Sequence, residues 1–326
     1  VRFPQNVCLP MHDCRLMDAF LGWGEGDFLR LRFCLVFPVP ASLDHQTVDE
    51  LLDSAATSSE DHTLFDARHV RWIDPNGMVG LLVAGSVVGE RHGGSPRLEL
   101  PESADVLGYL SRMGFFRAAE GIFEFDGRVP RRASSPSDVL LEITPIRANE
   151  DVHGVIDQVQ NRAGTVLAST LGYPATAVVP FSVILSEVCQ NIIEHADGLG
   201  WVAAQSYNWA KRLGRHVVVI SVMDVGRGFR GSLTDEHSAR YGDRWGDTTA
   251  LEAAFLHGLT RFPDSGRGQG IQQIRRQVQR WNGAITIRSG AARIAQVPEW
   301  DDSPPVVVDL EPCPGAQISI ILPAVE

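Results

Sequence analysis

One polar stretch, residues 127–138, constrains the fold more than any other feature, because it carries prolines and no hydrophobic periodicity. We interpret it as a linker. On both sides of it, short apolar strands alternate with helical patterns, which predicts an α/β protein with more than one domain. The expected division is an N-terminal segment at 1–27, a smaller domain at 28–126, the linker, and a larger domain at 139–326.

Hydrophobic periodicity predicts the main elements of both parts. Before the linker we expect strands at 31–36 and 63–67 and helices at 45–56 and 77–88. After it we expect strands at 140–146, 201–208, 216–224, 284–288 and 317–322, and helices at 152–171, 180–196 and 270–281. A proline-rich acidic stretch at 297–311 is predicted to be an inserted loop between the last two strands.

Charge and composition exclude several classes of function. The chain has 326 residues, of which 44% are hydrophobic and 21% charged, as in ordinary soluble proteins of about two domains. A net charge of -11 repels a nucleic-acid backbone and an anionic membrane, so we expect neither as a partner. Lys211 is the only lysine and follows no glycine, which excludes a Walker-type phosphate loop.

The cysteines indicate a reducing compartment. There are five, an odd number without a Cys-x-x-Cys pair, which favours reduced thiols in the cytoplasm over a disulfide framework. Cys8, His12 and Cys14 lie close enough in sequence for a metal clip, but a fourth ligand at motif spacing is absent. The uncharged stretch Ala163–Ser186 has the length of a membrane span, yet its glycines and prolines predict a helix end, a turn and a new helix start.

The first chemically informative pattern lies on the helix expected at 180–196. Glu187, Asn191 and His195 recur every four residues, so they share one stripe beside an apolar one. A solvated polar face would explain these three residues alone. Such a face, however, has no preference for asparagine in the middle of a helix, where it is a poor helix former.

The second pattern is the apolar strand expected at 216–224, which ends in Asp224 and then in Gly226 and Gly228. An acid at the end of a buried strand can accept hydrogen bonds from an amino group in an apolar pocket, and glycines allow close approach of a ligand. An ordinary strand and glycine turn is the alternative. The glycines at 226, 228 and 231 also match G-x-G-x-x-G, but we reject a dinucleotide site because 232–247 is polar and aperiodic.

The third pattern is a glycine run at 264–271 that opens directly into the helix expected at 270–281. Unpaired backbone N–H groups and the positive end of a helix dipole form a natural phosphate cradle there. A flexible loop with a helix cap is the alternative. Three such patterns in this order make a common site the better interpretation.

In order and spacing, these three patterns resemble the Bergerat-fold ATP-binding domain of the gyrase, histidine-kinase and mismatch-repair ATPase superfamily (GHKL). The resemblance covers about 139–326 and implies a two-layer α+β sandwich that binds ATP and Mg²⁺. The lid sequence at 250–261 looks closest to the anti-sigma-factor serine-kinase branch. The resemblance implies these nucleotide-binding residues: Asn191, Asp224, Gly226, Gly228, Thr260, Gly266, Arg267, Gly268 and Gly270.

The resemblance also implies individual roles. Glu187 would be the general base, Asn191 the Mg²⁺ ligand, and Asp224 the acceptor for the adenine amino group. A mobile lid would span about 229–265, with Arg261 and Arg267 as candidates for charge stabilisation. Two departures weaken the match. Gly315-Ala316 stands where the family often has Gly-Thr, which removes one hydroxyl, and the 291–314 insert lengthens the approach to the last strand.

The upstream region carries a second resemblance. The sequence at 64–82 is similar to the core of a STAS domain, the fold of anti-sigma-factor antagonists, over about 28–126. Asn76 occupies a position where that family often has a phosphorylatable serine, so phosphorylation there is excluded. A generic strand, turn and helix is the alternative interpretation.

Together the patterns predict a Mg-ATP-binding signalling regulator. It would hydrolyse ATP or phosphorylate a serine of a protein partner of the STAS or sigma-factor type. We also consider that two copies of the chain form a homodimer. The alternative is a nucleotide-gated interaction module with negligible turnover. An ATP-driven clamp is disfavoured because such clamps use a lysine from a following domain. A histidine kinase is disfavoured because we find no dimerising helical hairpin with a phospho-acceptor histidine before this domain, and His153, near a helix start, is only a weak candidate.

Overall fold

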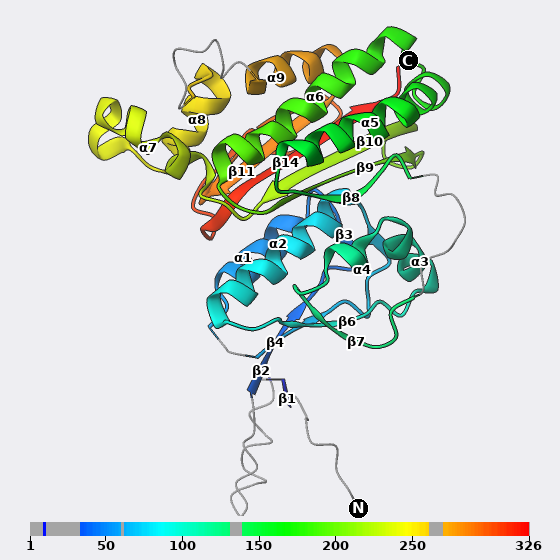
Figure 1. Ribbon diagram of the computed structural model, residues 1–326, viewed down its shortest axis with the longest axis vertical. Coiled ribbons are helices and arrows are strands. Elements are labelled where there is room, and N and C mark those ends of the chain that lie inside the picture. Colours follow the sequence, from blue (N-terminus) through cyan, green and yellow to red (C-terminus); the bar gives the residue numbers. More distant parts are fainter. Residues whose placement is uncertain (1–8, 11–32, 60–61, 131–138, 261–269, 326) are drawn as a thin grey trace, which may run out of the picture.

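The computed structural model describes residues 9–10, 33–59, 62–130, 139–260 and 270–325. Within these residues it combines helices with one larger parallel sheet and one larger antiparallel sheet (Figure 1). The general α/β class expected from the sequence is therefore confirmed.

The N-terminal region is built on a parallel sheet with the order β1-β2-β4-β6-β7, beside a short β3-β5 pair. Apolar residues of β2, β4 and β6 pack against helices α1 and α2 in one hydrophobic core. The described elements are β1 Leu9–Pro10, β2 Phe33–Pro38, β3 Ser42–Leu43, α1 Val48–Ala56, β4 Thr63–Asp66, β5 Trp72–Ile73, α2 Pro75–His92, β6 Arg97–Glu99, α3 Ala104–Arg112, α4 Phe115–Ala118 and β7 Glu124–Asp126.

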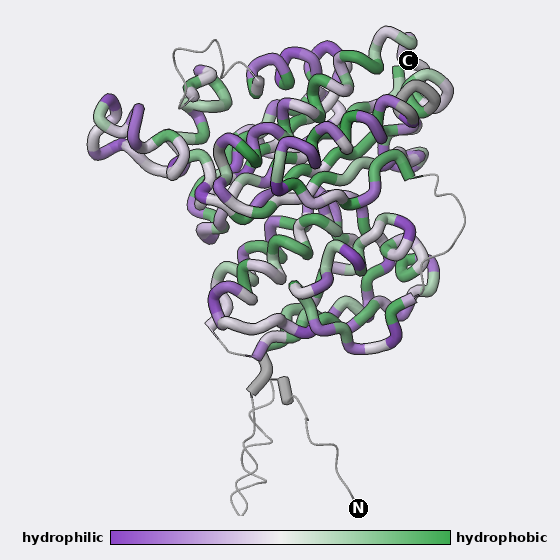
Figure 2. Tube along the Cα trace, viewed as in Figure 1, coloured by the Kyte–Doolittle hydropathy of each residue, from purple (hydrophilic) through white to green (hydrophobic). Residues whose placement is uncertain are grey.

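Helix α2 is the centre of that core. It is apolar on nearly every side, and such a helix has to be covered all round (Figure 2). The Asp74 carboxylate caps its first turn by accepting the Gly77 N–H at 3.0 Å. A Cβ on Gly80 would lie 2.2 Å from Val48 of α1, so glycine permits the close approach of the two helices.

The C-terminal region is built on an antiparallel sheet with the order β13-β12-β11-β14-β10-β9-β8, called the seven-stranded sheet below. The last strand in sequence, β14, lies at its centre. The described elements are β8 Leu141–Ile146, α5 Asn149–Thr165, η2 Val166–Thr170, η3 Ala175–Ala177, α6 Val178–Asn191, η4 Ile192–Ala196, β9 Gly200–Trp209, β10 Arg215–Asp224, α7 Gly228–Tyr241, η5 Gly242–Arg244, α8 Asp247–His257, α9 Gly270–Arg280, β11 Ala284–Gly290, β12 Ala292–Gln296, β13 Val306–Val307 and β14 Cys313–Pro323.

Both faces of the seven-stranded sheet are covered (Figure 1). Helices α5, α6 and α9 pack on one face, against residues such as Val218, Ile220 and Val222 of β10. The N-terminal region covers the other face, where Trp201 and Met223 join the core around α2. Strands buried on both faces are apolar throughout rather than alternating, which explains the continuous apolar run of β10.

Two local elements differ from the expectation. No helix was predicted at 232–247, yet most of this polar stretch belongs to α7, which begins at Gly228 and buries only Ser232 and Leu233. So small a buried face leaves no apolar stripe for a sequence pattern to reveal. The 297–311 stretch is not a plain loop either, since the insert adds β12 and β13 to the edge of the sheet beside β11.

One helical stretch of the described chain, Ala175–Glu194, is long and apolar enough to cross a membrane by composition alone. This evidence is weak, because the core helix of a soluble protein passes the same test. Of its most apolar window, 44% is buried, and α6 places Phe181, Leu185 and Val188 in the core on the seven-stranded sheet.

Candidate functional site

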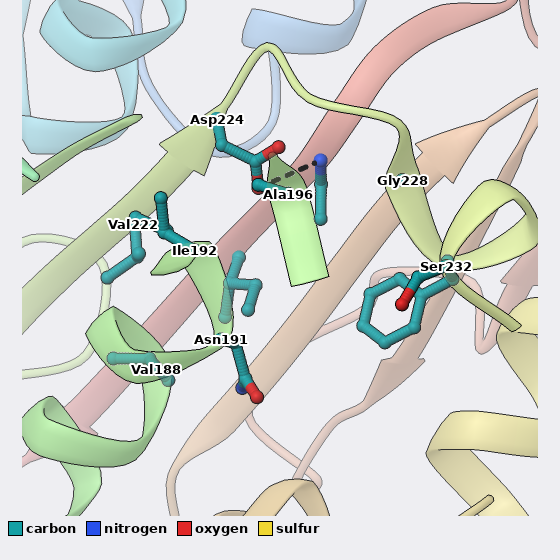
Figure 3. Close-up of a pocket in the computed structure, with 11 residues that line it drawn as sticks. Val188, Asn191, Ile192, Ala196, Val222, Asp224, Gly228 and Ser232 are labelled. Atoms are coloured by element: carbon teal, nitrogen blue, oxygen red, sulfur yellow. Dashed lines mark hydrogen bonds between the residues drawn. The ribbon is translucent and has the colours of Figure 1, made fainter. Parts of the chain in front are cut away.

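A cavity that is partly open to solvent lies between α6, β10, β14 and the start of α7 (Figure 3). Its walls are mainly apolar, with a few polar groups converging on it, which is the usual composition of a small-molecule site. It is lined by Val188, Asn191, Ile192, Ala196, Val222, Asp224, Gly228, Phe229, Ser232, Ala316 and Ile318.

Asp224 closes β10 and places a carboxylate in this apolar wall. The residue is 5% exposed, and the carboxylate accepts the backbone N–H groups of Gly226 at 2.8 Å and Ala316 at 3.3 Å. Burial raises its pKa to about 6, although the two N–H groups oppose that shift. The carboxylate is therefore mostly charged at pH 7 and is suited to accept a hydrogen bond from an amino group in the cavity.

Asn191 enters the cavity from the end of α6, and Figure 3 shows it across the cavity from Asp224. Its Nδ2 atom is buried and has no hydrogen-bond partner among the described residues. Buried polar atoms are nearly always paired in proteins, so an unpaired one at a cavity indicates a missing ligand or water. Asn191 is followed by the π-helical turn η4, an irregularity that is frequent at functional sites.

Glu187 lies one helical turn before Asn191 and is half-buried. Burial, and then the nearby charge of Glu194, raise the pKa of its carboxyl. A Cβ on Gly270, the first residue of α9, would lie 2.3 Å from Glu187 Oε2. The acid of α6 therefore lies against the N-terminus of α9, where free N–H groups and the helix dipole favour an anion.

The glycines around Asp224 are required mainly by packing. A Cβ on Gly226 would lie 2.1 Å from the carbonyl oxygen of Ala196, and one on Gly315 would lie 1.9 Å from that of Asp224. Gly315 also has a φ of 78° and sits in a β-bulge, where the β11–β14 register shifts. These close approaches bring the loop after β10 and the start of β14 together around the carboxylate.

The structure brings together only part of the set expected from the sequence. Asn191, Asp224 and Gly228 line the cavity, Glu187 and Gly270 meet beside it, and Gly226 packs behind Asp224. Thr260 does not line it. That residue is buried, and its carbonyl oxygen is 2.8 Å from Nε2 of His237 on α7. Outside the described residues or side chains lie Cys8, His12, Cys14, His195, Arg261, Gly266, Arg267 and Gly268.

Sequence reasoning missed two polar or aromatic wall residues, Phe229 and Ser232, because it expected no helix there. The apolar part of the cavity wall could be predicted in part from the sequence. Val222 shares a strand face with Asp224, and Ile318 shares one with Ala316, as strand periodicity requires.

The comparisons give no relative from which to assign these residues: no family model, curated protein or solved structure matches the chain. Among the described residues, no group of three or more His, Cys, Asp or Glu side chains is placed to hold a metal ion. The case for a function therefore depends on the cavity itself.

Proposed function

We propose that the C-terminal region is a GHKL-like nucleotide-binding domain that binds Mg-ATP, and that the protein is a signalling regulator. The observation that carries the proposal is the meeting of Asp224 and Asn191 in one apolar cavity, beside the N-terminus of α9. The order of helix, acid-ended strand and glycine-led helix supports a Bergerat-type fold, with helices on one face of an antiparallel sheet.

In this proposal Asp224 selects adenine. The base lies in the apolar part of the cavity, between residues such as Ile192 and Val222, and donates its amino hydrogens to the carboxylate. Guanine presents a carbonyl oxygen at that edge, which the charged acid would repel. The phosphates extend toward Asn191 and the start of α9.

The residues present fit a magnesium ion bound together with phosphates. Mg²⁺ takes oxygen ligands and is usually held by one or two side chains and the phosphate oxygens, and the amide oxygen of Asn191, which lines the cavity, can supply the protein part. When bound, the ion would neutralise charge on the transferring phosphoryl group. Asn191 would then orient the phosphates, and the first N–H groups of α9 would stabilise their charge.

Glu187 acts as general base in this proposal. Its carboxylate takes the proton of an attacking hydroxyl as that oxygen bonds to the γ-phosphorus and the bond from phosphorus to the ADP oxygen breaks. The raised pKa makes the acid a stronger base. If the hydroxyl belongs to water the reaction is hydrolysis, and if it belongs to a serine of a partner protein the reaction is phosphorylation.

The N-terminal region is proposed to be a STAS-like docking unit that acts with a cytoplasmic protein partner. Asn76 is fully buried at the start of α2, and an amide cannot accept a phosphoryl group. Regulation through this region therefore depends on binding rather than on phosphorylation of that position.

Calorimetry with ATP, ADP and GTP, with and without Mg²⁺, tests the binding proposal, and product analysis tests turnover. We expect ATP to bind with Mg²⁺ and GTP to bind far more weakly; a preference for GTP would contradict the role of Asp224. Glu187→Gln should lower turnover about 10²- to 10⁴-fold and leave the ATP Kd within about twofold. If ATP binding is lost as well, Glu187 is not the base.

The same measurements decide the alternative, a nucleotide-gated interaction module. That alternative predicts ATP binding by the wild type without turnover above the Glu187→Gln level. Partner capture that depends on ATP would then define the function.

A further inference from the structure

Two consecutive residues of β11 contact the segments that enclose the cavity and the N-terminal region. Ile285 and Ile287 face the helices α5, α6 and α9, and Ser289 continues that face. Arg288 lies between them in sequence and therefore points to the opposite face, toward α1. Both side chains are buried, with Arg288 1% and Ser289 3% exposed.

On the cavity side, the Ser289 hydroxyl joins three segments. Its Oγ atom donates to the carbonyl oxygen of Gly315 at 2.8 Å and accepts the N–H of Phe229 at 3.0 Å. Gly315 belongs to the β14 bulge that precedes Ala316, the residue whose N–H reaches the Asp224 carboxylate. Phe229 is the second residue of α7 and lines the cavity. One hydroxyl therefore sets the spacing of the strand, the bulge and the helix that enclose Asp224.

On the other side, the Arg288 guanidinium holds α1. Its Nη1 atom donates to Asp49 Oδ1 at 3.0 Å and to the Asp49 carbonyl oxygen at 3.2 Å, and its Nη2 atom donates to an Asp53 carboxylate oxygen. Arg293 donates to the second oxygen of Asp49 at 2.8 Å. Asp49 and Asp53 are one helical turn apart and so share one face of α1.

This ion cluster, in which the arginine is buried and the aspartates are partly exposed, connects β11 to α1. The guanidinium is 2% exposed, and its Nη2 atom also donates to the Glu311 carbonyl oxygen at 2.8 Å. Removing the Asp53 carboxylate leaves this buried charge with fewer partners, and we expect the strand to shift in response. Because Ser289 is the next residue along the same strand, a shift of Arg288 moves the hydroxyl that spaces the cavity wall.

We propose that helix α1 of the N-terminal region is a positioning element for the nucleotide cavity, acting through Arg288 and Ser289 of β11. The proposal rests on the proposed function, since the cavity is taken to hold ATP. Ser289 sets the geometry around Asp224, and Asp49 and Asp53 hold Ser289 in place through Arg288. Because coupling between two sites is reciprocal, ATP binding also strengthens the contact between α1 and the sheet.

The test compares Asp53→Asn and Ser289→Ala with Glu50→Gln, which removes an exposed charge from the same helix. We expect Ser289→Ala to raise the Kd for Mg-ATP about tenfold and Asp53→Asn about three- to tenfold, while Glu50→Gln changes it less than twofold. The kcat should stay within about twofold, because Glu187 and Asn191 lie on α6 and Ser289 contacts neither. A general loss of folding would instead lower the apparent kcat, because fewer molecules would be active, and would leave the Kd of the folded molecules unchanged.

The double variant supplies a second readout. If α1 acts through Ser289, Asp53→Asn combined with Ser289→Ala raises the Kd by less than the product of the two single effects. Independent effects, or an unchanged Kd in Asp53→Asn together with a lowered unfolding stability, would overturn the proposal.

Hydrogen exchange of the protein without nucleotide separates this proposal from the proposed function. Asp53→Asn should speed exchange of the Phe229 and Ala316 amides relative to wild type and Glu50→Gln, with the α6 amides unchanged. If the wild type binds no ATP, the proposed function fails while this measurement still tests the connection. If exchange at both amides is unchanged in Asp53→Asn, the connection is wrong whatever the cavity binds.

Discussion

Two aspartates, Asp224 and Asp74, share deep burial, a glycine N–H partner and a raised pKa. Asp224 is 5% and Asp74 1% exposed, and each accepts a glycine N–H, at 2.8 Å and 3.0 Å. Burial raises the pKa of Asp224 to about 6 and that of Asp74 to about 7. Judged by burial and pKa alone, both would be functional residues.

Their surroundings separate them. Asp224 opens on a cavity that also contains Asn191, with an unpaired amide nitrogen. Asp74 does not line that cavity and caps the first turn of α2, where the backbone is tightly packed: a Cβ on Gly77 would lie 2.2 Å from the Leu43 carbonyl oxygen. Asp74 also has a polar neighbour, since the buried side chain of Asn76 lies two residues away and has unpaired atoms. A perturbed acid therefore indicates a site only when a cavity accompanies it. We interpret Asp74 as a structural cap and Asp224 as the ligand-binding acid.

The largest expected effect is on stability, at Asp74. Its folded-state pKa of about 7 exceeds the ordinary 3.8, so folding favours the neutral form, and this contribution to stability is fully present below about pH 3.8 and lost as the pH rises through 7. Asp74→Asn keeps a capping oxygen without the charge. The unfolding free energy of Asp74→Asn minus that of the wild type should therefore rise by about 2 to 4 kcal/mol from pH 4 to pH 8, as measured by urea titration.

Asp74→Ala is the matched control for that measurement. It removes the charge and the cap, and so should be less stable than Asp74→Asn by about 1 kcal/mol at every pH. If the difference in unfolding free energy between wild type and Asp74→Asn does not depend on pH, burial does not raise the pKa of Asp74. The two acids would then not share a raised pKa.

The next effect is on ligand binding, and here the two acids should diverge. Asp224→Ala should weaken Mg-ATP binding about 10- to 100-fold, since a hydrogen bond to a charged acceptor contributes about 1.5 to 3 kcal/mol. Asp74→Ala should leave the Kd within about twofold. Calorimetry on both variants decides the comparison, and equal losses would mean that the effect at Asp224 is a general one on the fold.

The smallest effect concerns pH. Protonation of Asp224 removes its negative charge and part of its accepting capacity, so adenosine should bind about tenfold more weakly at pH 5 than at pH 7.5, given a pKa of about 6. Adenosine is the appropriate probe because it has no phosphate groups that titrate in this range. Asp74→Asn should show the same profile; a profile that disappears in that variant would assign the titration to the wrong acid.

Much of this arrangement could be predicted from the sequence, where burial leaves a pattern. The apolar face of α6, the continuous apolar run of β10 and the glycine-led start of α9 each predicted the right element. The spacing of Glu187 and Asn191 placed both on one side of α6. What the pattern could not supply was α7, whose polar surface contains too few apolar residues to indicate a helix.

The contacts on the second face of the seven-stranded sheet could not be predicted from the sequence either. A charged residue in a strand normally indicates solvent, yet Arg288 is buried because its partners, Asp49 and Asp53, come from a segment more than two hundred residues away. Short elements such as β6 and β13 depend on pairing with neighbouring strands rather than on their own propensity. Long-range partners of this kind leave no local signature.

The central position of β14 has a consequence for biogenesis. A ribosome releases the chain in order, so β10 and β11 emerge with no neighbour between them until residues 313–323 have been synthesised. Until then two long apolar edges stay open, and the acid at 224 has no wall opposite it. Nascent chains of this protein should therefore depend on chaperones until β14 has been synthesised, and ligand binding can begin only once that strand has inserted.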